Sequence, residues 1–411
     1  MHALIIGYVW PEPASSAAGS RMLQLIAALQ GFGYAVRFAS PAADSEHAVD
    51  LPALGVEVAR IALNHSSFDE QIQAWQPDLV LFDRFMMEEQ FGWRVEKYCP
   101  AALRILDSED LHFLRDARQQ ALRHKHPQQF ADYSASELCK REIAAIYRCD
   151  MTLVISPFEL DFLQREFSIA ADLLCYCPFM EDISRINPAD DFAARAHFIS
   201  IGNFRHAPNW DAVLELKRLW PEIRRAVPHA EMHIYGAYPP PKASQLHNAR
   251  EGFLIKGWAE DASAVISAAR VLLAPLRFGA GIKGKLADAM ACGTPSVTTP
   301  VGAEGMQASR PWGGAVCDND ADFIAQAIAL YQDENTWQRA RAAGIANFAE
   351  LYAAPRHREY LGQRLQDLRN NLSAKRSANF IGSMLRHHSM KSTQYMAQWI
   401  EAKNKLPQNQ A

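Results

Sequence analysis

Short runs of apolar residues alternate along the chain with longer stretches in which apolar residues recur every three or four positions. In the first half, five apolar runs predict buried strands, at residues 3–6, 36–39, 79–82, 103–106 and 151–155. The same alternation restarts with five further runs, at residues 198–201, 232–235, 253–255, 271–274 and 296–298. The intervening segments are mostly long enough for crossover helices, so the pattern predicts two doubly wound α/β domains with parallel sheets.

A polar stretch punctuated by Pro and Asn, residues 177–191, separates the two series and marks the expected domain boundary. We expect an N-terminal domain over residues 1–180 and a C-terminal domain over residues 190–345. After Asp322 the strand pattern stops, and residues 346–411 are expected to form a helical C-terminal segment. Ligands of such domains bind at the carboxyl ends of the strands, so we expect a ligand between the domains.

The composition is that of an ordinary globular protein. Of 411 residues, 49% are hydrophobic and 21% are charged, which excludes a largely disordered or fibrous chain. The formal net charge is −4, so the molecule as a whole is not a general polyanion binder. Seven cysteines lack the paired spacing of zinc ribbons and are interpreted as reduced core thiols.

The N-terminal sequence bears on cellular location. Its first apolar run ends at Pro11, follows no basic region and is too short for a signal peptide or a membrane span. We therefore expect a cytoplasmic protein. Attachment to the inner face of a membrane stays open, because peripheral binding needs no span.

Charge is unevenly distributed along the chain. Residues 351–411 contain ten Lys or Arg and three Asp or Glu, a net charge of +7, which leaves −11 for the remainder. A solvated helical face explains this basic tail, and so does docking to anionic lipid or to nucleic acid. The tail also contains His387 and His388, but adjacent residues point apart on a helix, so no metal site is expected there.

The most informative segment is Gly279 to Pro300, GAGIKGKLADAMACGTPSVTTP. It predicts a glycine loop after a buried strand, followed by a helix that begins near Lys283 and stops at Gly293. The glycines allow a ligand to approach the backbone closely. Together with the free amides of the helix start, Lys283 and Lys285 form a predicted site for an anion such as a diphosphate.

Two alternatives apply to this segment. The spacing from Gly279 to Lys285 also fits a phosphate-binding loop of the Walker A type, but the next residue is Leu286. Without a Ser or Thr hydroxyl there, the Mg²⁺ ligand of such an NTPase is missing. The other alternative is a tight strand-to-helix turn whose lysines face solvent.

The sequence PLRFGAGIKGKLADAMACGTPSVTT resembles the donor-site motif of retaining glycosyltransferases of the GT-B fold, family 4 type, also called glycosyl transferases group 1. Residues 199–209, ISIGNFRHAPN, resemble the first strand and loop of that family's C-terminal domain. Residues 11–22, PEPASSAAGSRM, occupy the first strand-to-helix loop of its N-terminal domain. The resemblance implies two Rossmann-like domains that face each other across a cleft.

The resemblance also implies an activity. The chain is expected to move a hexosyl or related sugar from a nucleotide diphosphate sugar to a hydroxyl acceptor with retention, without a metal or other cofactor. The expected acceptor is a glycan or a lipid-linked precursor. Many members of the family carry two glutamates at the positions that read Ala280 and Asp288 here. Asp288 is expected to bind the ribose hydroxyls, and contact with the sugar passes to backbone amides between Gly279 and Ile282.

Several further residues are predicted to hold the donor, and each has an alternative. Gly19, beside Ser15 and Ser16, would let the first helix direct its amides at the phosphate; the alternative is a flexible loop. Arg205, with Asn203 and His206, follows a strand end and would reach the diphosphate; the alternative is a surface loop shaped by Pro208.

The segment IKGWAED, residues 255–261, resembles the turn on which the family seats the nucleobase. Backbone groups near Gly257 and Trp258 are therefore implied in base binding. Trp258 has an alternative as a core residue. The donor-binding prediction as a whole comprises Gly19, Arg205, Gly257, Trp258, Gly279, Gly281, Ile282, Lys283, Lys285 and Asp288.

On the acceptor side, DSEDLHFLR places several charged residues directly after a predicted strand. The resemblance implies that residues at this edge face the bond that is broken, so we expect Glu109, Asp110 and His112 to be catalytic, with Arg115 as a charge partner. An acidic helix N-cap that begins at Ser108 explains the same residues.

A second acceptor-side candidate is DRFMMEEQ, residues 83–90, which concentrates charge after another strand. Asp83 and Arg84 would line the acceptor side of the cleft or pair with each other.

Two rival functions remain open from the sequence. One is a non-catalytic protein that binds sugar nucleotides or polyanions, suggested by Ala280 and the basic tail. The other keeps the transferase chemistry but uses an RNA or nucleoside acceptor.

Overall fold

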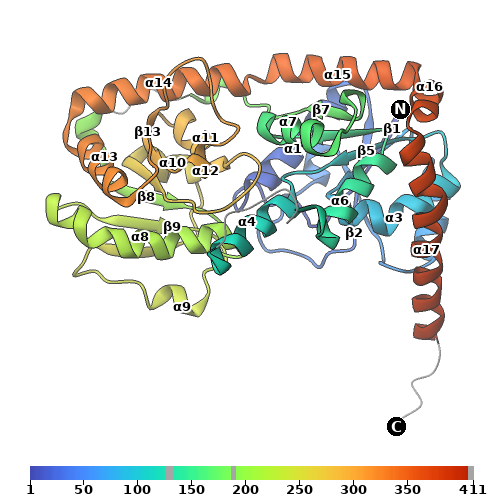
Figure 1. Ribbon diagram of the computed structural model, residues 1–411, viewed down its shortest axis with the longest axis horizontal. Helices are drawn as coiled ribbons and strands as arrows, with labels where there is room; N and C mark the ends of the chain where they lie inside the picture. Colours follow the sequence, from blue (N-terminus) through green and yellow to red (C-terminus); the bar gives the residue numbers. More distant parts are fainter. Residues whose placement is uncertain (126–132, 187–190, 406–411) are drawn as a thin grey trace, which may run out of the picture.

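The computed structural model describes residues 1–125, 133–186 and 191–405 and contains two parallel sheets, each covered by helices (Figure 1). The first sheet has the strand order β3-β2-β1-β4-β5-β6-β7 and the second the order β10-β9-β8-β11-β12-β13. Within the described residues the strands of both sheets pair in parallel, which requires crossover connections and gives the doubly wound arrangement that the apolar pattern predicts.

The N-terminal sheet is formed by β1 (His2–Ile6), β2 (Ala35–Ser40), β3 (Glu57–Arg60), β4 (Leu79–Asp83), β5 (Leu103–Asp107), β6 (Met151–Val154) and β7 (Leu174–Tyr176). Its helices are α1 (Ala17–Gly31), α2 (Ser67–Trp75), α3 (Phe85–Tyr98), α4 (His112–His124), α6 (Glu137–Arg148) and α7 (Pro157–Phe167). Both faces of the sheet are apolar because helices cover both, and two separate core clusters lie on its two sides.

The C-terminal sheet is formed by β8 (Ala196–Ile201), β9 (Met232–Tyr235), β10 (Phe253–Gly257), β11 (Ala269–Ala274), β12 (Ser296–Thr298) and β13 (Gly314–Val316). Its helices are α8 (Ala207–Ala226), α9 (Pro241–Ser244), α10 (Ala262–Ala268), α11 (Gly284–Ala291), α12 (Pro300–Ala303), α13 (Asp320–Gln332) and α14 (Glu334–Tyr352). The predicted boundary between the two domains, residues 180–190, falls between β7 and β8, and residues 187–190 within it lie outside the described residues.

Each of the ten predicted apolar runs lies on a strand, and three further strands were missed. β3 is an edge strand whose sequence EVAR is half charged and mostly exposed, so it lacks the apolar signature of a buried strand. β7 and β13 have three residues each and, unlike the equally short β12, neither is buried along its whole length, so both lack a clear apolar run.

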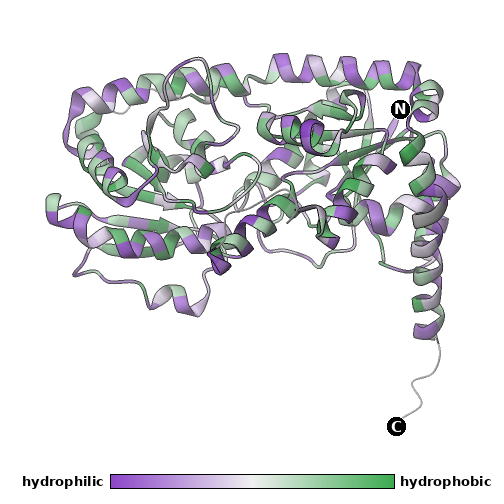
Figure 2. Ribbon diagram, viewed as in Figure 1, coloured by the Kyte–Doolittle hydropathy of each residue, from purple (hydrophilic) through white to green (hydrophobic). Residues whose placement is uncertain are grey.

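Three helices follow α14 and pack against the N-terminal domain: α15 (Ala354–Asn370), α16 (Leu372–Ala378) and α17 (Phe380–Lys405) (Figure 1). Leu361, Leu365 and Leu368 of α15 belong to the same core cluster as β1 and β2. Figure 2 shows the rest of α15 as largely hydrophilic. The C-terminal segment is therefore built onto the first sheet.

Basic side chains of this segment also take part in that packing. Arg376 donates to the buried carboxylate of Asp150 at 2.7 Å, and Arg369 donates to the hydroxyl of Tyr34. The interpretation of the whole basic tail as a solvated face is therefore wrong for these residues. Within the described part of the chain, no helix has the length and apolar character needed to cross a bilayer.

Candidate donor and acceptor site

A cavity of about 190 Å³ lies between the two domains, at the carboxyl ends of β1, β4 and β5. It is lined by Val9, Trp10, Pro11, Glu12, Ser16, Ala18, Gly19, Met22, Asp83, Arg84 and Glu109 from the N-terminal domain and Asn203, Arg205 and Tyr238 from the C-terminal domain. Ligand pockets usually enclose about 300 to 1,000 Å³, so a nucleotide sugar needs more room than this closed arrangement offers. Of the residues predicted for donor binding and catalysis, Gly19, Glu109 and Arg205 line the cavity, and so do the further candidates Asp83, Arg84 and Asn203.

The loop between β1 and α1 forms one wall and is tightly folded. The amides of Ser15 and Ser16 both donate to the Glu12 carbonyl at 3.0 Å, and the Ser16 hydroxyl caps α1 by accepting from the Gly19 amide at 3.1 Å. A Cβ atom on Gly19 would lie 2.4 Å from the Glu12 carbonyl. Any residue larger than glycine at position 19 would therefore clash with this loop. The loop is held by hydrogen bonds, in contrast to the flexible loop considered as the alternative.

Buried charges form the floor of the cavity. Because residues Asp83 and Asp107 pair in register at the ends of β4 and β5, their carboxylates share one sheet edge. The fully buried Arg21 donates to Asp107 Oδ1 at 2.8 Å, and its Nε lies 4.0 Å from Glu109 Oε1. Asp83 Oδ2 accepts from the Tyr8 amide at 2.9 Å and lies 3.3 Å from Arg84 Nη1. Asp83 and Arg84 thus pair with each other and also line the cavity, as the two alternatives for these residues predicted.

Glu109 is the predicted catalytic residue that reaches the cavity. Burial and the neighbouring Asp107 raise the pKa of its carboxyl to about 8, against the opposing effect of Arg21 and Arg84. Its φ of 58° is left-handed, and so is the φ of 70° at Arg84 on the adjacent strand end. Such backbone conformations are costly for residues with side chains and cluster at functional sites. A carboxyl that titrates near neutrality is suited to exchanging a proton with a hydroxyl.

Asp110 and His112 lie next to Glu109 but outside the cavity lining. Burial opposes ionisation of Asp110, yet the ion pair with Arg115 and the nearby His112 outweigh it and lower its pKa. His112 Nε2 lies 3.6 Å from Asp110 Oδ1, and burial lowers the pKa of its imidazole to about 4 in spite of that carboxylate. At neutral pH the pair therefore consists of an ionised Asp110 and a neutral His112.

The alternative of an acidic helix N-cap at Ser108 is wrong. α4 begins at His112, and its N-cap residue is Leu111, whose side chain makes no capping hydrogen bond. The first amides of α4 donate instead to Glu142 of α6, at 3.1 Å from His112 and 3.0 Å from Phe113. Residues 108–110 are thus free of a capping role.

The predicted helix after the glycine loop is present as α11, with Lys283 as its N-cap residue. The glycines were expected to let a ligand approach the backbone, but they also let the two domains pack closely against each other. A Cβ atom on Gly281, whose φ is 63°, would lie 2.8 Å from Cβ of Asp110. A Cβ atom on Gly284 would lie 2.4 Å from Cβ of Ala17. Larger residues at either position would hold the two domains apart.

Glu159 of α7 is a residue of this contact that the sequence analysis missed. Its Oε1 accepts from the Gly281 amide at 2.7 Å and from the Leu111 amide at 3.0 Å, and the side chain is fully buried. Burial and Asp110 raise the pKa of this carboxyl to about 7. In this conformation the Gly281 amide, which was expected to face the sugar, thus binds a carboxylate from the other domain. Glu159 lies in the first turn of α7, where acidic residues are common because they interact favourably with the helix dipole. Its sequence position therefore does not indicate a contact with the other domain.

Both lysines of the glycine loop point into the protein. Lys283 Nζ donates to the Gly281 carbonyl and Lys285 Nζ to Asn209 Oδ1, each at 2.8 Å. Burial lowers the pKa of both ammonium groups to about 8. Within residues 1–125, 133–186 and 191–405 neither lysine forms an ion pair with a carboxylate. The alternative of solvent-facing lysines is therefore wrong. Lys283 has the carboxylates of Glu304 and Glu159 as charged neighbours, whereas burial alone accounts for the shift at Lys285, and such a desolvated cation favours an anionic ligand.

Lys285 lies close to the cavity. A Cβ atom on Gly202 would be 2.9 Å from Lys285 Nζ. Its partner Asn209 donates to the carbonyl of Asn203, which lines the cavity. Arg205 stacks on Tyr238, with its guanidinium carbon 3.6 Å from the ring centroid. The Tyr238 hydroxyl in turn donates to Glu12 Oε1 across the cleft at 2.9 Å.

The residues predicted for base and ribose lie away from the cavity lining. Trp258 is 39% exposed and stacks on His47 of the N-terminal domain at a centroid distance of 4.7 Å, so its alternative as a core residue is wrong. Gly257 has a left-handed φ of 76°. Asp288 is exposed on α11, whereas Ile282 is buried in a core cluster of the C-terminal domain.

A further contact links α4 to the glycine loop. Arg118 donates to both carboxylate oxygens of Glu304, at 2.7 and 2.8 Å, and to the carbonyl of Gly279 at 2.7 Å. Together with Glu159 and Tyr238 this arginine ties the two domains in a closed arrangement. A ligand larger than the cavity would enter only after these contacts open.

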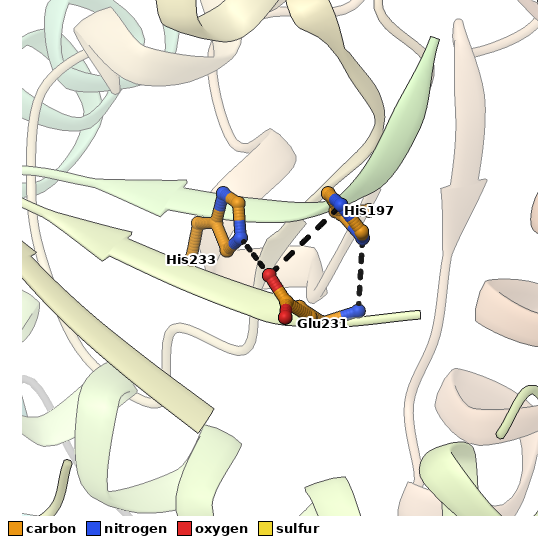
Figure 3. A group of neighbouring side chains, drawn as sticks. All are labelled: His197, Glu231 and His233. Atoms are coloured by element: carbon orange, nitrogen blue, oxygen red, sulfur yellow. Dashed lines mark hydrogen bonds and ion pairs between the residues drawn. The ribbon is translucent and has the colours of Figure 1, made fainter. Parts of the chain in front are cut away.

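The described residues contain one group with metal-ligating side chains, His197, Glu231 and His233 (Figure 3). Glu231 Oε2 lies 2.7 Å from His233 Nε2 and 3.9 Å from His197 Nε2. The Glu231 amide donates to His197 Nδ1 at 3.1 Å, so a neutral His197 carries its proton on Nε2 and offers no lone pair there. This group therefore ties β8 to β9 by hydrogen bonds. The side chain of His388, considered above, lies outside the described part of the chain.

Comparison with known proteins agrees with this architecture. Residues 195–333 match the family described as glycosyl transferases group 1. Sucrose-phosphate synthase of Thermosynechococcus elongatus is 16% identical over 90% of this chain and 99% of its own, with a TM-score of 0.66. HepE of Anabaena, solved with UDP and glucose, is 13% identical over 90% of this chain and 100% of HepE, with a TM-score of 0.65.

A third structure, TarM of S. aureus, is 11% identical over 72% of this chain, with a TM-score of 0.57, and this chain spans 57% of the length of TarM. A search of curated proteins finds no match in sequence. The fold is thus that of the GT-B glycosyltransferases. The match of residues 195–333 to the glycosyl transferases group 1 family agrees with the resemblance of the glycine loop.

Proposed function

We propose that this chain transfers a sugar from a nucleotide diphosphate sugar to a hydroxyl acceptor with retention of the anomeric configuration. The observation that carries the proposal is the pair of desolvated lysines at the start of α11, within a group 1 glycosyltransferase domain. HepE, which shares the fold, has been solved with UDP-glucose, and this supports a nucleotide sugar as the donor class.

In the proposed reaction, negative charge grows on the diphosphate as the anomeric bond breaks. Lys283, Lys285 and the first amides of α11 would stabilise that charge, together with Arg205, which lines the cavity. These groups are fixed in place before the reaction, so they pay little reorganisation energy during it. They supply positive charge from the protein itself, and the proposal therefore includes no metal or other cofactor.

On the acceptor side, Glu109 would bind the attacking hydroxyl within the cavity. Retention by attack on the same face, with the leaving phosphate taking the acceptor proton, fits a site in which both substrates lie between the domains. His112 and Asp110 would hold the loop of Glu109 in position. Closure of the two domains over both bound substrates would exclude water, which would otherwise hydrolyse the donor.

The expected acceptor is a glycan or a lipid-linked precursor. Thermal unfolding of the protein with a panel of nucleotide sugars would first identify the donor, because a bound ligand stabilises the folded state. Release of nucleoside diphosphate would then be measured with candidate acceptors. The double variant Lys283→Ala/Lys285→Ala is expected to stay folded and lose transfer. Wild-type turnover by that variant would refute the assignment of the leaving-group site.

A further inference from the structure

Helix α17 has two faces of different character. Its inner face is docked on α3, α6 and the start of α2 through Gly382, Arg386, Ala397 and Glu401. A Cβ atom on Gly382 would lie 2.1 Å from the Tyr147 carbonyl, and Ala397 packs with Trp93 in a buried cluster.

The ends of the inner face are held by polar contacts. Arg386 Nη1 donates to the Arg148 carbonyl at 3.3 Å, and Ser66 donates to Glu401 Oε1 at 2.6 Å. The inner residues are separated by four, eleven and four positions, which keeps them on one side of a helix with 3.6 residues per turn.

The opposite side presents large apolar side chains to solvent. We call it the outer face and define it by Phe380, Ile381, Met384, Lys391, Tyr395, Met396 and Trp399, all of which are exposed. Phe380, Tyr395 and Trp399 are 74%, 63% and 59% exposed. Phe380, Met384, Tyr395 and Trp399 repeat the inner spacing two residues earlier, so they lie on the far side of the helix. Figure 1 shows α17 at the end of the N-terminal domain remote from the C-terminal domain, with its last turns projecting beyond the domain.

Exposed charge on this helix has one sign. Lys391 lies in the middle of the outer face, and Lys403 sits over the Trp399 ring at 5.2 Å from its centroid. Among the described side chains of α17 none of the exposed residues is a carboxylate, because Glu401 is turned inward to Ser66.

We propose that the outer face of α17 binds the surface of an anionic lipid bilayer, with the helix lying parallel to the membrane plane. Apolar and aromatic side chains on one face, with lysines beside them, are the features of helices that lie in the membrane interface. Tyr and Trp favour the headgroup level, and the lysine stems allow their ammonium groups to reach lipid phosphates.

Two other occupants fit the face less well. If a second copy of the chain bound this face, Lys391 would be buried in an apolar interface. The outer face has no exposed carboxylate that could pair with it, so the burial would be costly. A nucleic acid needs a row of cations along its backbone, but tail cations such as Arg376 and Lys375 are bound to Asp150 and Asp367. The outer face is mainly apolar, which a bilayer interface accommodates.

The test is flotation of the full chain with vesicles of phosphatidylcholine, with and without phosphatidylglycerol. We expect flotation with the anionic vesicles that weakens as salt is raised. The variant Tyr395→Ser/Trp399→Ser is expected to lower partitioning by about tenfold or more, since burial of one large side chain is worth roughly that factor. Trp399→Phe should retain most of it. Leu214→Ser, at an exposed leucine of α8, is the matched control and should float like the wild type.

Circular dichroism would establish that each variant is folded. The proposal is overturned if the wild type does not float, if it floats equally with neutral vesicles, or if the double serine variant floats undiminished. It is also overturned if sedimentation shows a dimer that the double variant dissociates while no vesicle binding occurs, or if only RNA binding responds to the variant. Because the readout is vesicle binding, its failure would leave the proposed glycosyl transfer untouched.

Discussion

Replacement of Lys285 by methionine tests how the protein would hold the diphosphate. Burial lowers the pKa of this lysine from 10.5 to about 8. At about 1.4 kcal/mol per pKa unit the shift corresponds to about 3 kcal/mol against the charged form. Solvent reaches part of the side chain, so we discount that figure to about 1.5 to 3 kcal/mol.

A bound diphosphate would recover this energy by giving the ammonium group an anionic partner. Lys285→Met is therefore expected to weaken binding of a nucleoside diphosphate by about ten- to hundredfold, since 1.4 kcal/mol is a factor of ten. The same change removes a desolvated charge and one hydrogen bond to Asn209, so the melting temperature should not fall appreciably.

Isothermal titration calorimetry would measure the affinity, and differential scanning calorimetry the stability. Lys242→Met is the matched control, because Lys242 belongs to the same domain, is exposed and should not affect binding. Unchanged affinity in Lys285→Met would show that this ammonium group does not bind the diphosphate. So would a large loss of stability with proportionate loss of affinity, since that would make the lysine structural.

Three further predictions concern the same region. A bound diphosphate would raise the lowered pKa of Lys285, so binding should take up protons above pH 8 and weaken as the pH rises from 8 to 10. Calorimetry in buffers of different ionisation enthalpy measures this proton uptake. Release of protons on binding would contradict the prediction. Asp288→Ala should weaken nucleotide binding by about 1 to 3 kcal/mol, and an unaltered affinity would count against the ribose role. Glu159→Ala should lower the melting temperature because the amides of Leu111 and Gly281 lose their acceptor. Glu159→Gln keeps an acceptor and should have a melting temperature close to that of the wild type. Equal stability of the alanine variant and the wild type would disprove the role of this contact.

Much of the fold was accessible from the sequence because buried parallel strands are continuous apolar runs. The runs at residues 79–82 and 103–106 became β4 and β5, and the glycine loop correctly located the start of α11. Edge and very short strands were missed, since β3 is half charged and β7 has three residues. The strand pattern also carried no information on where the last helices would pack.

The site was predicted less completely, for a physical reason. Sequence patterns identify residues at strand ends but not which of them meet across two domains. Nothing in the sequence near Glu159 indicates that it accepts the amide of Gly281, because the two are far apart along the chain. Likewise the stacking of Trp258 on His47 depends on how the domains face each other. The roles of Glu109, Asp110 and His112 in catalysis stay predictions.

The most direct test of the account is a crystal structure of the protein with a nucleoside diphosphate. We expect phosphate oxygens within hydrogen-bonding distance of Lys285 Nζ and the first amides of α11, with the Glu159 contact to Gly281 opened or rearranged. A nucleotide bound elsewhere, with Lys285 still on Asn209 and no phosphate near α11, would contradict it.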